Sequence, residues 1–229
     1  MDPLEAFGVW RLFPFSPATT QAETLGADWF VFSVAATAVG LVVIALILAP
    51  PLLWRRRSGA LPVQNAGHRV VELGSTLTAT AIVVGLFFFA TLPHERAVDA
   101  TVASPDEVVN VTAFRWSWRF AYPGTPVTIV GTPMTEPELV LPLGKTTEID
   151  LRSADVQHSF WVPGFLFKRD AVPGILNRFD LTPTRVGDFE GVCAQFCGLD
   201  HTHMRFRVHV VPAEAFARWI SSGNRKRFS

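Results

Sequence analysis

The chain has 229 residues, no net charge at neutral pH and 49% hydrophobic residues, with 19 Phe and 7 Trp but one Tyr. This composition is too apolar for an ordinary soluble domain, and the apolar residues are not evenly spread along the chain. The balanced charge says little by itself about partners, and we expect no nucleic-acid partner.

Two long stretches of the chain carry no charged residue. Trp29 to Trp54 has none over 26 positions, and Leu73 to Pro93 has none over 21. A helix needs roughly 20 apolar residues to cross the hydrocarbon core of a membrane. Both stretches therefore predict membrane-spanning helices, at about residues 29–52 and 71–93. The alternative, two core helices of a soluble protein, is disfavoured because such helices normally carry a polar stripe.

The charges beside these stretches predict their orientation. The connecting segment, residues 55–72, opens with Arg55 to Arg57 and adds Arg69, and short basic loops stay in the cytoplasm. The flanks on the other side are acidic or mixed. We therefore expect a two-helix hairpin with a cytoplasmic loop, and both chain ends on the outer face. The chain begins MDPLEAFGVW, without the basic start of a signal peptide, so either the first span directs its own insertion or processing has left no clear mark.

From about residue 105 the pattern changes to short runs rich in Val, Thr, Phe and Trp, separated by Pro, Gly, Asn and Asp. Several short strands at this spacing predict a β-sandwich or barrel. The clearest strand begins at Met204, where apolar residues alternate with Arg205, Arg207 and His209. After Pro212, the sequence AEAFARWIS predicts a short amphipathic helix.

We expect three parts in the chain. Residues 1–104 hold the N-terminal segment and the hairpin, and residues 105–212 form an extracytoplasmic β-domain that is large enough to bury its own core. Residues 213–229 form a C-terminal helix and a basic tail.

The stretch GVCAQFCGLDHTHM, residues 191–204, holds both cysteines of the chain. A disulfide between Cys193 and Cys197 is allowed outside the cytoplasm, but it would close a very short loop and restrain the unfolded chain little. A zinc site is a second possibility, although zinc has no use for a methionine. His201 and Met204 follow at short spacing, and thiolate, imidazole and thioether together favour copper.

A further imidazole is available upstream, in DVQHSFWVPGF. His158, followed much later by Cys, His and Met on the loop that enters the last strand, has the layout of a single-copper cupredoxin site. Here two cysteines replace one. Because Cys193 and Cys197 are four residues apart, both thiolates could bridge a pair of copper ions.

The loop CAQFCGLDHTHM resembles the C-x3-C-x3-H-x2-M loop of subunit II of the heme-copper cytochrome c oxidases, which binds the dinuclear copper A centre. The resemblance covers nearly the whole chain, because the hairpin, FRWSWRFAYP, DVQHSFWVPGF and KRDAVPGILN stand in the family's order. It implies a two-helix transmembrane hairpin followed by an all-β, cupredoxin-like Greek-key sandwich or barrel.

The resemblance also implies a set of ligands for two copper ions. Cys193 and Cys197 match the bridging thiolates, and His158 and Met204 match the ligands of one copper. The other copper is matched by the imidazole of His201 and by the main-chain carbonyl of Gln195, a ligand that does not depend on the side chain.

Other aromatic and ionisable residues are weighed against ordinary structural roles. Trp116 matches the family's surface Trp at which electrons enter, whereas Trp118 is expected to be an ordinary strand aromatic. His203 and His209 share the strand phase of the arginines, so we expect both to face solvent. Two acidic residues match positions near the copper site and are assigned either a structural role there or none: Asp155 and Asp170.

Two further positions concern protons and magnesium. Glu72 lies at the cytoplasmic mouth of the second span, where ionisable residues are costly and often functional, and the resemblance implies the entrance of a proton path into subunit I. A Trp that the family usually has three residues later is replaced by Ser75.

Many relatives carry Glu in place of Gln195, as a magnesium ligand at the border with subunit I, so we expect no magnesium there or one held mainly by the partner.

The resemblance implies a subunit of a multi-subunit, proton-translocating oxidoreductase in the plasma membrane of a prokaryote. It would take electrons from cytochrome c, or from a cytochrome c domain of a neighbouring complex, and pass them to heme in subunit I, with subunit III as a further partner. The chain has no C-x-x-C-H motif and so no heme c of its own. Two alternatives are the copper A subunit of a nitric oxide reductase and, less favoured, a copper assembly factor. A quinol oxidase is disfavoured because its subunit II has lost these ligands.

Overall fold

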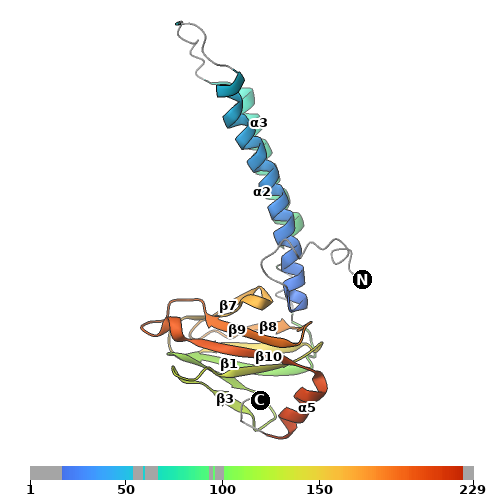
Figure 1. The fold of residues 1–229 in the computed structure, drawn as a ribbon, viewed down its shortest axis with the longest axis vertical. Coiled ribbons are helices and arrows are strands. Elements are labelled where there is room, and N and C mark those ends of the chain that lie inside the picture. Colours follow the sequence, from blue (N-terminus) through green and yellow to red (C-terminus); the bar gives the residue numbers. More distant parts are fainter. Residues whose placement is uncertain (1–16, 54–58, 60–66, 93–94, 96–100, 224–229) are drawn as a thin grey trace. The chain divides into compact units, whose positions relative to one another are not determined.

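A computed structural model describes residues 17–53, 59, 67–92, 95 and 101–223 of the chain. The chain divides into two compact units, and each is described by itself (Figure 1). One unit is Ala27–Arg96, which holds nearly all of the apolar helical sequence. The other joins the described residues 17–26 to the β-strands and helix that follow residue 101.

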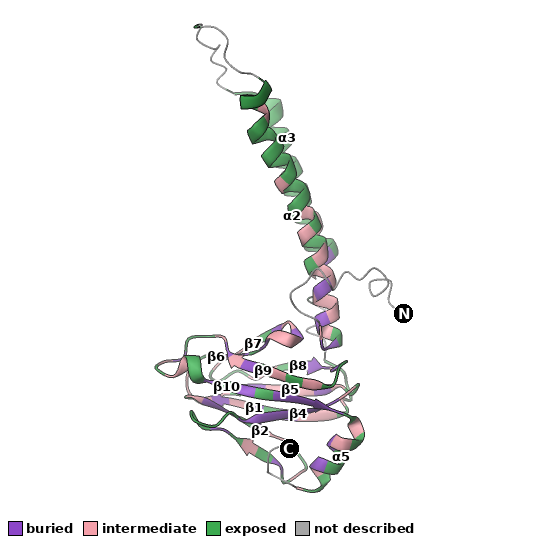
Figure 2. Ribbon diagram, in the orientation of Figure 1, coloured by how far each residue is buried: buried purple, intermediate pink, exposed green. Residues whose placement is uncertain are grey.

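Two helices account for the uncharged stretches of the sequence. Helix α2 is Thr20–Leu53, and helix α3 is Arg69–Leu86, continued by a π-helical turn at Phe87–Thr91. Both are long and apolar enough to cross a membrane, with mean hydropathy of 2.8 and 1.9. Most of their side chains are exposed on all faces (Figure 2), which suits lipid as a solvent better than a soluble core.

The observed helices and the expected spans differ at their ends. Helix α2 begins nine residues before the expected start at residue 29, because Thr19 caps it by accepting a hydrogen bond at its Oγ1 from the N–H of Ala22, at 3.0 Å. The arginines expected to set the orientation, Arg55 to Arg57, lie outside the described residues. The orientation of the hairpin therefore stays a prediction.

The β-domain is a sandwich of two five-stranded sheets. One sheet has the order β3-β2-β1-β5-β8 and the other β4-β10-β9-β6-β7. Each sheet contains one parallel pair, β1 with β5 and β10 with β4, among antiparallel neighbours. The strands are β1 Glu107–Phe114, β2 Ser117–Ala121, β3 Thr128–Val130, β4 Glu138–Pro142, β5 Thr147–Ser153, β6 His158–Val162, β7 Phe167–Ala171, β8 Asn177–Leu181, β9 Gly187–Cys193 and β10 Arg205–Val211.

The expected architecture, two long apolar helices followed by an all-β cupredoxin-like sandwich, is confirmed. The core between the sheets is built on aromatic rings that alternate inward along their strands. Trp118 lies in β2 and is fully buried, as predicted for a strand aromatic, and its ring meets those of Phe160 and Phe206 at 5.9 and 5.1 Å. These rings form an aromatic floor beneath the start of β6, where the ring of His158 lies 6.4 Å from that of Trp118.

Helix α5, Ala213–Ser221, is the amphipathic helix predicted after Pro212. It buries Phe216 and Trp219, whose rings pack around Tyr122. The hydroxyl of Tyr122 donates to the carbonyl of Val140 and accepts from the amide of the same residue, which satisfies the free edge of β4. The basic tail expected after the helix begins at residue 224 and lies outside the described residues.

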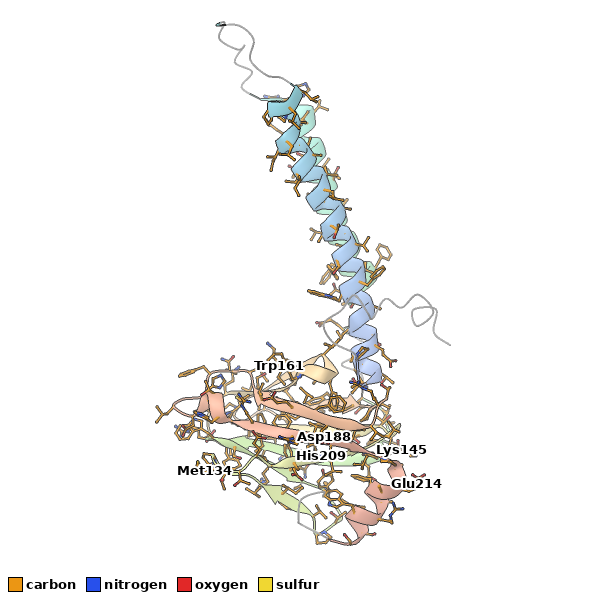
Figure 3. The ribbon with its side chains drawn as sticks, viewed as in Figure 1. Met134, Lys145, Trp161, Asp188, His209 and Glu214 are labelled. Atoms are coloured by element: carbon orange, nitrogen blue, oxygen red, sulfur yellow. The ribbon has the colours of Figure 1, made fainter. Side chains whose placement is uncertain are left out.

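The last strand confirms the predicted alternation but corrects one residue. Arg205 and Arg207 are exposed, whereas His209 is 9% exposed and not solvent-facing as expected. Its Nδ1 lies 2.6 Å from a carboxylate oxygen of Asp188, and its Nε2 lies 3.6 Å from one of Glu138 (Figure 3). The alternation indicates which face of the sheet His209 occupies, but it says nothing about neighbouring side chains that cover that face.

Candidate metal centre

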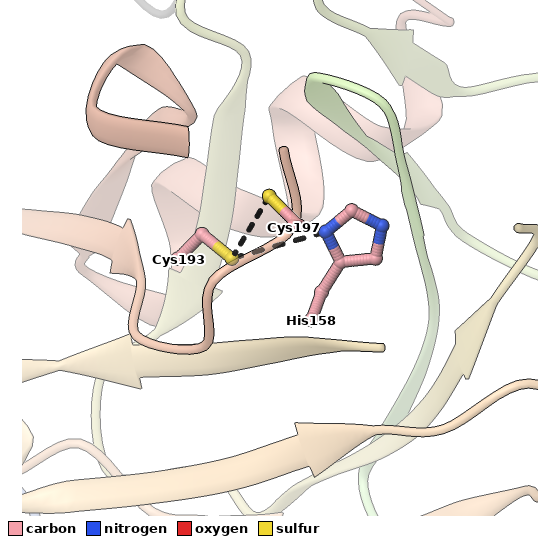
Figure 4. A group of neighbouring side chains, drawn as sticks. All are labelled: His158, Cys193 and Cys197. Atoms are coloured by element: carbon pink, nitrogen blue, oxygen red, sulfur yellow. Dashed lines mark hydrogen bonds between the residues drawn. The ribbon is translucent and has the colours of Figure 1, made fainter. Parts of the chain in front are cut away.

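A cluster of soft donor atoms lies at one end of the sandwich. The Sγ atoms of Cys193 and Cys197 are 3.8 Å apart, and Nδ1 of His158 is 3.8 Å from Sγ of Cys193 (Figure 4). The ligand atoms of these three residues all lie within 4.8 Å of one another. All three are buried, and both cysteines are free thiols, so the arrangement does not contain the disulfide that the sequence left open.

The neighbouring strands bring these residues together from distant parts of the chain. His158 is the first residue of β6 and Cys193 the last of β9, and these strands pair with Phe160 opposite Cys193. The N–H of Ala194 donates to the carbonyl of Ser159, so the pairing continues into the loop. The register of two antiparallel strands thus sets the distance between the histidine and the first thiol.

The loop after β9 adds the remaining expected donors. Sγ of Cys197 lies 3.5 Å from Nδ1 of His201 and 3.7 Å from Sδ of Met204. His201 opens the short 3-10 helix His201–His203, which turns the chain so that Met204 points back into the core. The N–H of Cys193 donates to the carbonyl of Met204, which closes the loop on itself.

The main chain contributes as well. The carbonyl oxygen of Gln195 lies 3.3 Å from Sγ of Cys193, so it points into the cluster, while the side chain of Gln195 is exposed. His203, two residues after His201, is exposed as expected, and its Nδ1 lies 3.9 Å from a carboxylate oxygen of Asp200. The six candidate ligand groups from the sequence are therefore brought together, and His203 is not among them.

The donor set fits copper. Two thiols, two imidazoles and a thioether are soft or borderline ligands. Four of these five residues are nearly inaccessible to water, whereas His201 is half-buried. The four are His158, Cys193, Cys197 and Met204, at 0, 6, 5 and 1%. The 3.8 Å between the Sγ atoms is less than twice a metal–sulfur bond of ~2.3 Å. A metal ion can therefore touch both sulfurs, and an imidazole stands beside each of them.

The two thiols differ in their acidity. Burial opposes ionisation of Cys193, but hydrogen bonds from His158 and from main-chain amides outweigh it and lower the pKa of Cys193. Burial and the neighbouring Cys193 sulfur both raise the pKa of Cys197. One thiolate is therefore favoured by the protein alone, and the second requires the positive charge of bound metal, so metal loading should release protons.

His158 is held from behind by Asp155. A carboxylate oxygen of Asp155 lies 2.8 Å from Nε2 of His158, leaving Nδ1 free to face the sulfurs. The other carboxylate oxygen accepts the N–H of Arg115 at 2.8 Å. Burial alone would raise the pKa of Asp155, but these hydrogen bonds lower it to about 2. The carboxylate fixes the ring orientation and the tautomer that a metal requires.

Asp170, the other acidic residue that the sequence placed near the site, has a more remote position. Its carboxylate accepts a hydrogen bond from the side chain of Gln157 at 3.1 Å, and its main-chain carbonyl accepts one from Asn177. Neither contact reaches a candidate ligand. In the described part of the chain, the carboxylate of Asp155 is hydrogen-bonded to a candidate ligand, His158, whereas that of Asp170 is not.

Trp116 connects the cluster to the surface. It is half-buried, and its indole Nε1 donates to the carbonyl oxygen of Cys197 at 3.2 Å. Gly198 permits this approach, since its φ is +120° and an added Cβ would lie 3.2 Å from the indole nitrogen. The Trp ring is thus one hydrogen bond from the main chain of a candidate ligand.

Two features of the region were not predicted. Phe196 is 76% exposed and its ring lies edge-on to His201 at 5.8 Å, so it covers that imidazole. Leu199, on the same loop, is 88% exposed. A loop with two exposed apolar residues beside buried ligands is typical of a contact surface, and the missed signal was the pair of apolar residues between polar ligand positions.

Glu72 lies apart from this cluster, in the first turn of α3. It is exposed, and its main-chain carbonyl accepts hydrogen bonds from the hydroxyls of Ser75 and Thr76. The family's Trp position is thus filled by a serine that bonds to its own helix and not to Glu72's carboxylate.

Comparisons with known proteins agree with the sequence motifs. Residues 128–211 match the family model described as cytochrome C oxidase subunit II, periplasmic domain. The probable cytochrome c oxidase subunit 2 of Streptomyces avermitilis is 34% identical over 250 residues, which cover 92% of this chain and 78% of that protein. Cytochrome c oxidase subunit 2 of Corynebacterium glutamicum is 31% identical, over 89% of this chain and 73% of that protein.

Among solved structures, the periplasmic domain of subunit II of cytochrome oxidase from Bradyrhizobium japonicum is similar, with 30% identity and a TM-score of 0.49, covering 54% of this chain and 96% of that one. The sequence relatives extend over both the apolar helices and the β-domain, at an identity and coverage that common ancestry accounts for. The chain therefore belongs to the cytochrome c oxidase subunit II family.

Proposed function

We propose that the chain is the subunit of a heme-copper terminal oxidase that accepts electrons from cytochrome c at a dinuclear copper centre and passes them to heme in subunit I. The observation that carries the proposal is the pair of buried free thiols, 3.8 Å apart, with an imidazole beside each and a thioether behind. A single-metal site has no need of the second thiol.

The residues that would hold the metal are His158, Cys193, Cys197, His201 and Met204, with the main-chain carbonyl of Gln195. Copper bound there supplies one-electron redox chemistry, with the charge spread over two ions through two sulfurs. The protein's part is rigidity. His158 is fixed by Asp155 and by the aromatic floor around Trp118, so the ligands need not rearrange when the charge changes.

Two surface features support transfer of electrons from a protein donor. Trp116 provides an aromatic ring that is in contact with solvent and is hydrogen-bonded to the main-chain carbonyl of Cys197. Phe196 and Leu199 give exposed apolar area beside it on the ligand loop, and apolar and aromatic residues provide most of the binding energy at protein interfaces. A docked donor would therefore lie within reach of the metal.

The family and the two apolar helices support a proposal for the setting of the chain. We propose that α2 and α3 anchor the chain in the plasma membrane of a prokaryote, with the β-domain on the outer face, and that subunits I and III are its partners there. Reduction of oxygen to water and proton pumping would belong to the whole complex, with Glu72 at the mouth of a proton path on the cytoplasmic side.

One experiment separates the candidate functions. Reduced cytochrome c is added to the purified complex without oxygen, the copper absorbance is followed, and then oxygen or nitric oxide is supplied. We expect the copper to be reduced first and oxygen to be consumed. Consumption of nitric oxide alone would indicate a nitric oxide reductase, and loss of copper to a partner during turnover would indicate an assembly factor.

A further inference from the structure

The segment Asp180–Thr184, at the end of β8, contacts three other segments of the same compact unit. The first is the strap, residues 17–22, which ends in the first turn of helix α2. The second is the linker, residues 101–106, which follows α3 in the sequence. The third is the turn between β4 and β5, residues 143–146. We name Asp180–Thr184 the junction. The segments that enter and leave the apolar helices thus meet the β-domain at one place.

The strap is bound to the junction through its backbone. The N–H of Thr184 donates to the carbonyl of Ala18 at 2.9 Å, and the N–H of Thr20 donates to that of Thr182 at 3.1 Å. The N–H of Thr182 also donates to the side-chain oxygen of Gln21 at 3.1 Å. The strap's small side chains are fully buried: Ala18, Thr19 and Ala22.

The linker is bound through a side chain. A carboxylate oxygen of Asp180 accepts the N–H of Val102 at 2.7 Å. Asp180 is only 3% exposed, and its other oxygen is buried with no hydrogen-bond partner in the described part of the chain. Burial raises the pKa of this carboxyl, and the N–H of Val102 lowers it only in part.

The β4–β5 turn joins the linker to the junction a second time. The N–H of Asp106 donates to the carbonyl of Thr146, and the N–H of Thr146 donates to the carboxylate of Asp106, at 2.9 Å each. The hydroxyl of Thr146 lies 3.0 Å from that of Thr182. The N–H of Gly144 donates to the carbonyl of Pro183 at 2.9 Å. The β4–β5 turn therefore contacts both the junction and the linker. The direct hydrogen bond from the junction to Val102 of the linker is made by the side chain of Asp180.

An aspartate at this position opposes the stability of the sheet. A buried carboxyl group with one oxygen lacking a partner is costly, and the residue directly opposite on β5 is a second acidic residue, Glu148. The N–H of Val102 alone does not demand an aspartate, since a linker residue near the surface could be satisfied by water. The residue is therefore better explained by what it holds than by the stability of β8.

We propose that Asp180 is a positioning residue for electron transfer: by accepting the N–H of Val102, it fixes the chain that leaves the second apolar helix to the same junction that holds the chain entering the first. The two segments that border the apolar helices in the sequence are thereby held at one place on the β-domain. The inference rests on the proposed function, because the benefit of a fixed attachment is a fixed distance from copper to the heme of subunit I.

The test uses the full chain in the purified complex. Asp180→Leu keeps the size of the side chain but removes the acceptor, whereas Asp180→Asn keeps an acceptor and removes the charge. Asp150→Leu is the matched control, because Asp150 lies on the neighbouring strand β5 and pairs with Arg178 at 3.0 Å, away from the linker. Hydrogen exchange at the amide of Val102 and in the strap is measured, together with the rates of electron uptake and of onward transfer to heme.

We expect Asp180→Leu to speed exchange at Val102 by roughly tenfold, as for loss of one hydrogen bond, and to slow onward transfer while the copper spectrum and electron uptake stay normal. Asp180→Asn and Asp150→Leu should behave as the parent in both measurements. Parent-like exchange or onward transfer in Asp180→Leu would overturn the inference, as would an Asn variant that behaves like the Leu variant.

A second variant covers the case in which Asp180→Leu does not fold. Val102→Pro removes the donor and leaves the carboxylate in place, and it should slow onward transfer in the same way; a normal rate would overturn the inference. A parent complex without copper would instead contradict the proposed function, while exchange at Val102 in the variants would still decide whether the junction exists.

Discussion

The indole of Trp116 donates a hydrogen bond to the main-chain carbonyl of Cys197, over 3.2 Å. Cys197 is also one of the two thiols of the candidate copper centre, 3.8 Å from the other. A half-buried aromatic ring is thus joined to the metal ligands through one hydrogen bond and one residue. The contact gives Trp116 two separable properties, an N–H that holds the loop and a ring that can meet a donor.

Replacement of Trp116 should separate these two properties. Trp116→Ala should slow reduction of the copper by cytochrome c roughly tenfold or more, since truncating a Trp at the centre of an interface commonly costs about 2 kcal/mol. Trp116→Phe keeps a ring and should retain more of the rate. Stopped-flow absorbance measures both, with copper content as the control; an unchanged rate in the Ala variant would make Trp116 an ordinary aromatic residue of the turn between β1 and β2.

Removal of the carboxylate behind His158 should weaken copper binding. Asp155→Ala takes away the 2.8 Å contact that orients the imidazole, and loss of such a partner typically lowers metal affinity by about 10- to 100-fold. Asp170→Ala is the control, because Asp170 bonds to Gln157 and not to the imidazole. Competition with a copper chelator measures the affinity, and equal affinities in the two variants would refute a positioning role for Asp155.

Glu72→Gln should impair proton uptake more than electron uptake. Glu72 is exposed in the first turn of α3, and an ionisable residue at the mouth of a membrane span is often functional. Reduction of copper by cytochrome c should stay near normal, while steady-state oxygen consumption falls severalfold. If turnover matches that of the parent, the residue is a charge at the level of the lipid headgroups.

Gln195→Glu should change affinity for a hard cation without changing the copper. The carbonyl of residue 195 points into the cluster while its side chain is exposed, so the two groups can act independently. Magnesium prefers charged oxygen ligands in octahedral geometry. Manganese bound in place of magnesium should be held more tightly by the Glu variant, with the copper spectrum unchanged; equally tight binding by the parent would show that the side chain is irrelevant to that ion.

The sequence predicts the parts of this protein that repeat a local pattern. The uncharged stretches predict the two helices, and the alternation around Phe206 and Val208 predicts β10, because a helix in lipid and a strand with one buried face impose a periodic pattern. Short-range order along the chain is sufficient for these features. The six candidate ligand groups are predicted from their spacing and from the family motif, and the pairing of β6 with β9 brings His158 to the cysteines.

Features that depend on contacts between distant segments were missed. His209 shares the phase of two exposed arginines, yet Glu138 and Asp188 on neighbouring strands enclose it. The strap before α2 belongs to the β-domain because Thr182 and Thr184 bond to it, and these residues are more than 150 positions away. Neither relationship leaves a periodic pattern in the sequence.

Copper content and electron spin resonance of the oxidised protein test directly whether the site is a dinuclear copper centre. We predict two copper ions per chain and a spectrum in which one unpaired electron is shared between two copper nuclei. Cys193→Ser removes one of the two sulfurs, and it should abolish the shared signal and leave the electron on one copper. A parent protein that holds a single copper with a localised signal, unchanged by replacing either cysteine, would contradict the account.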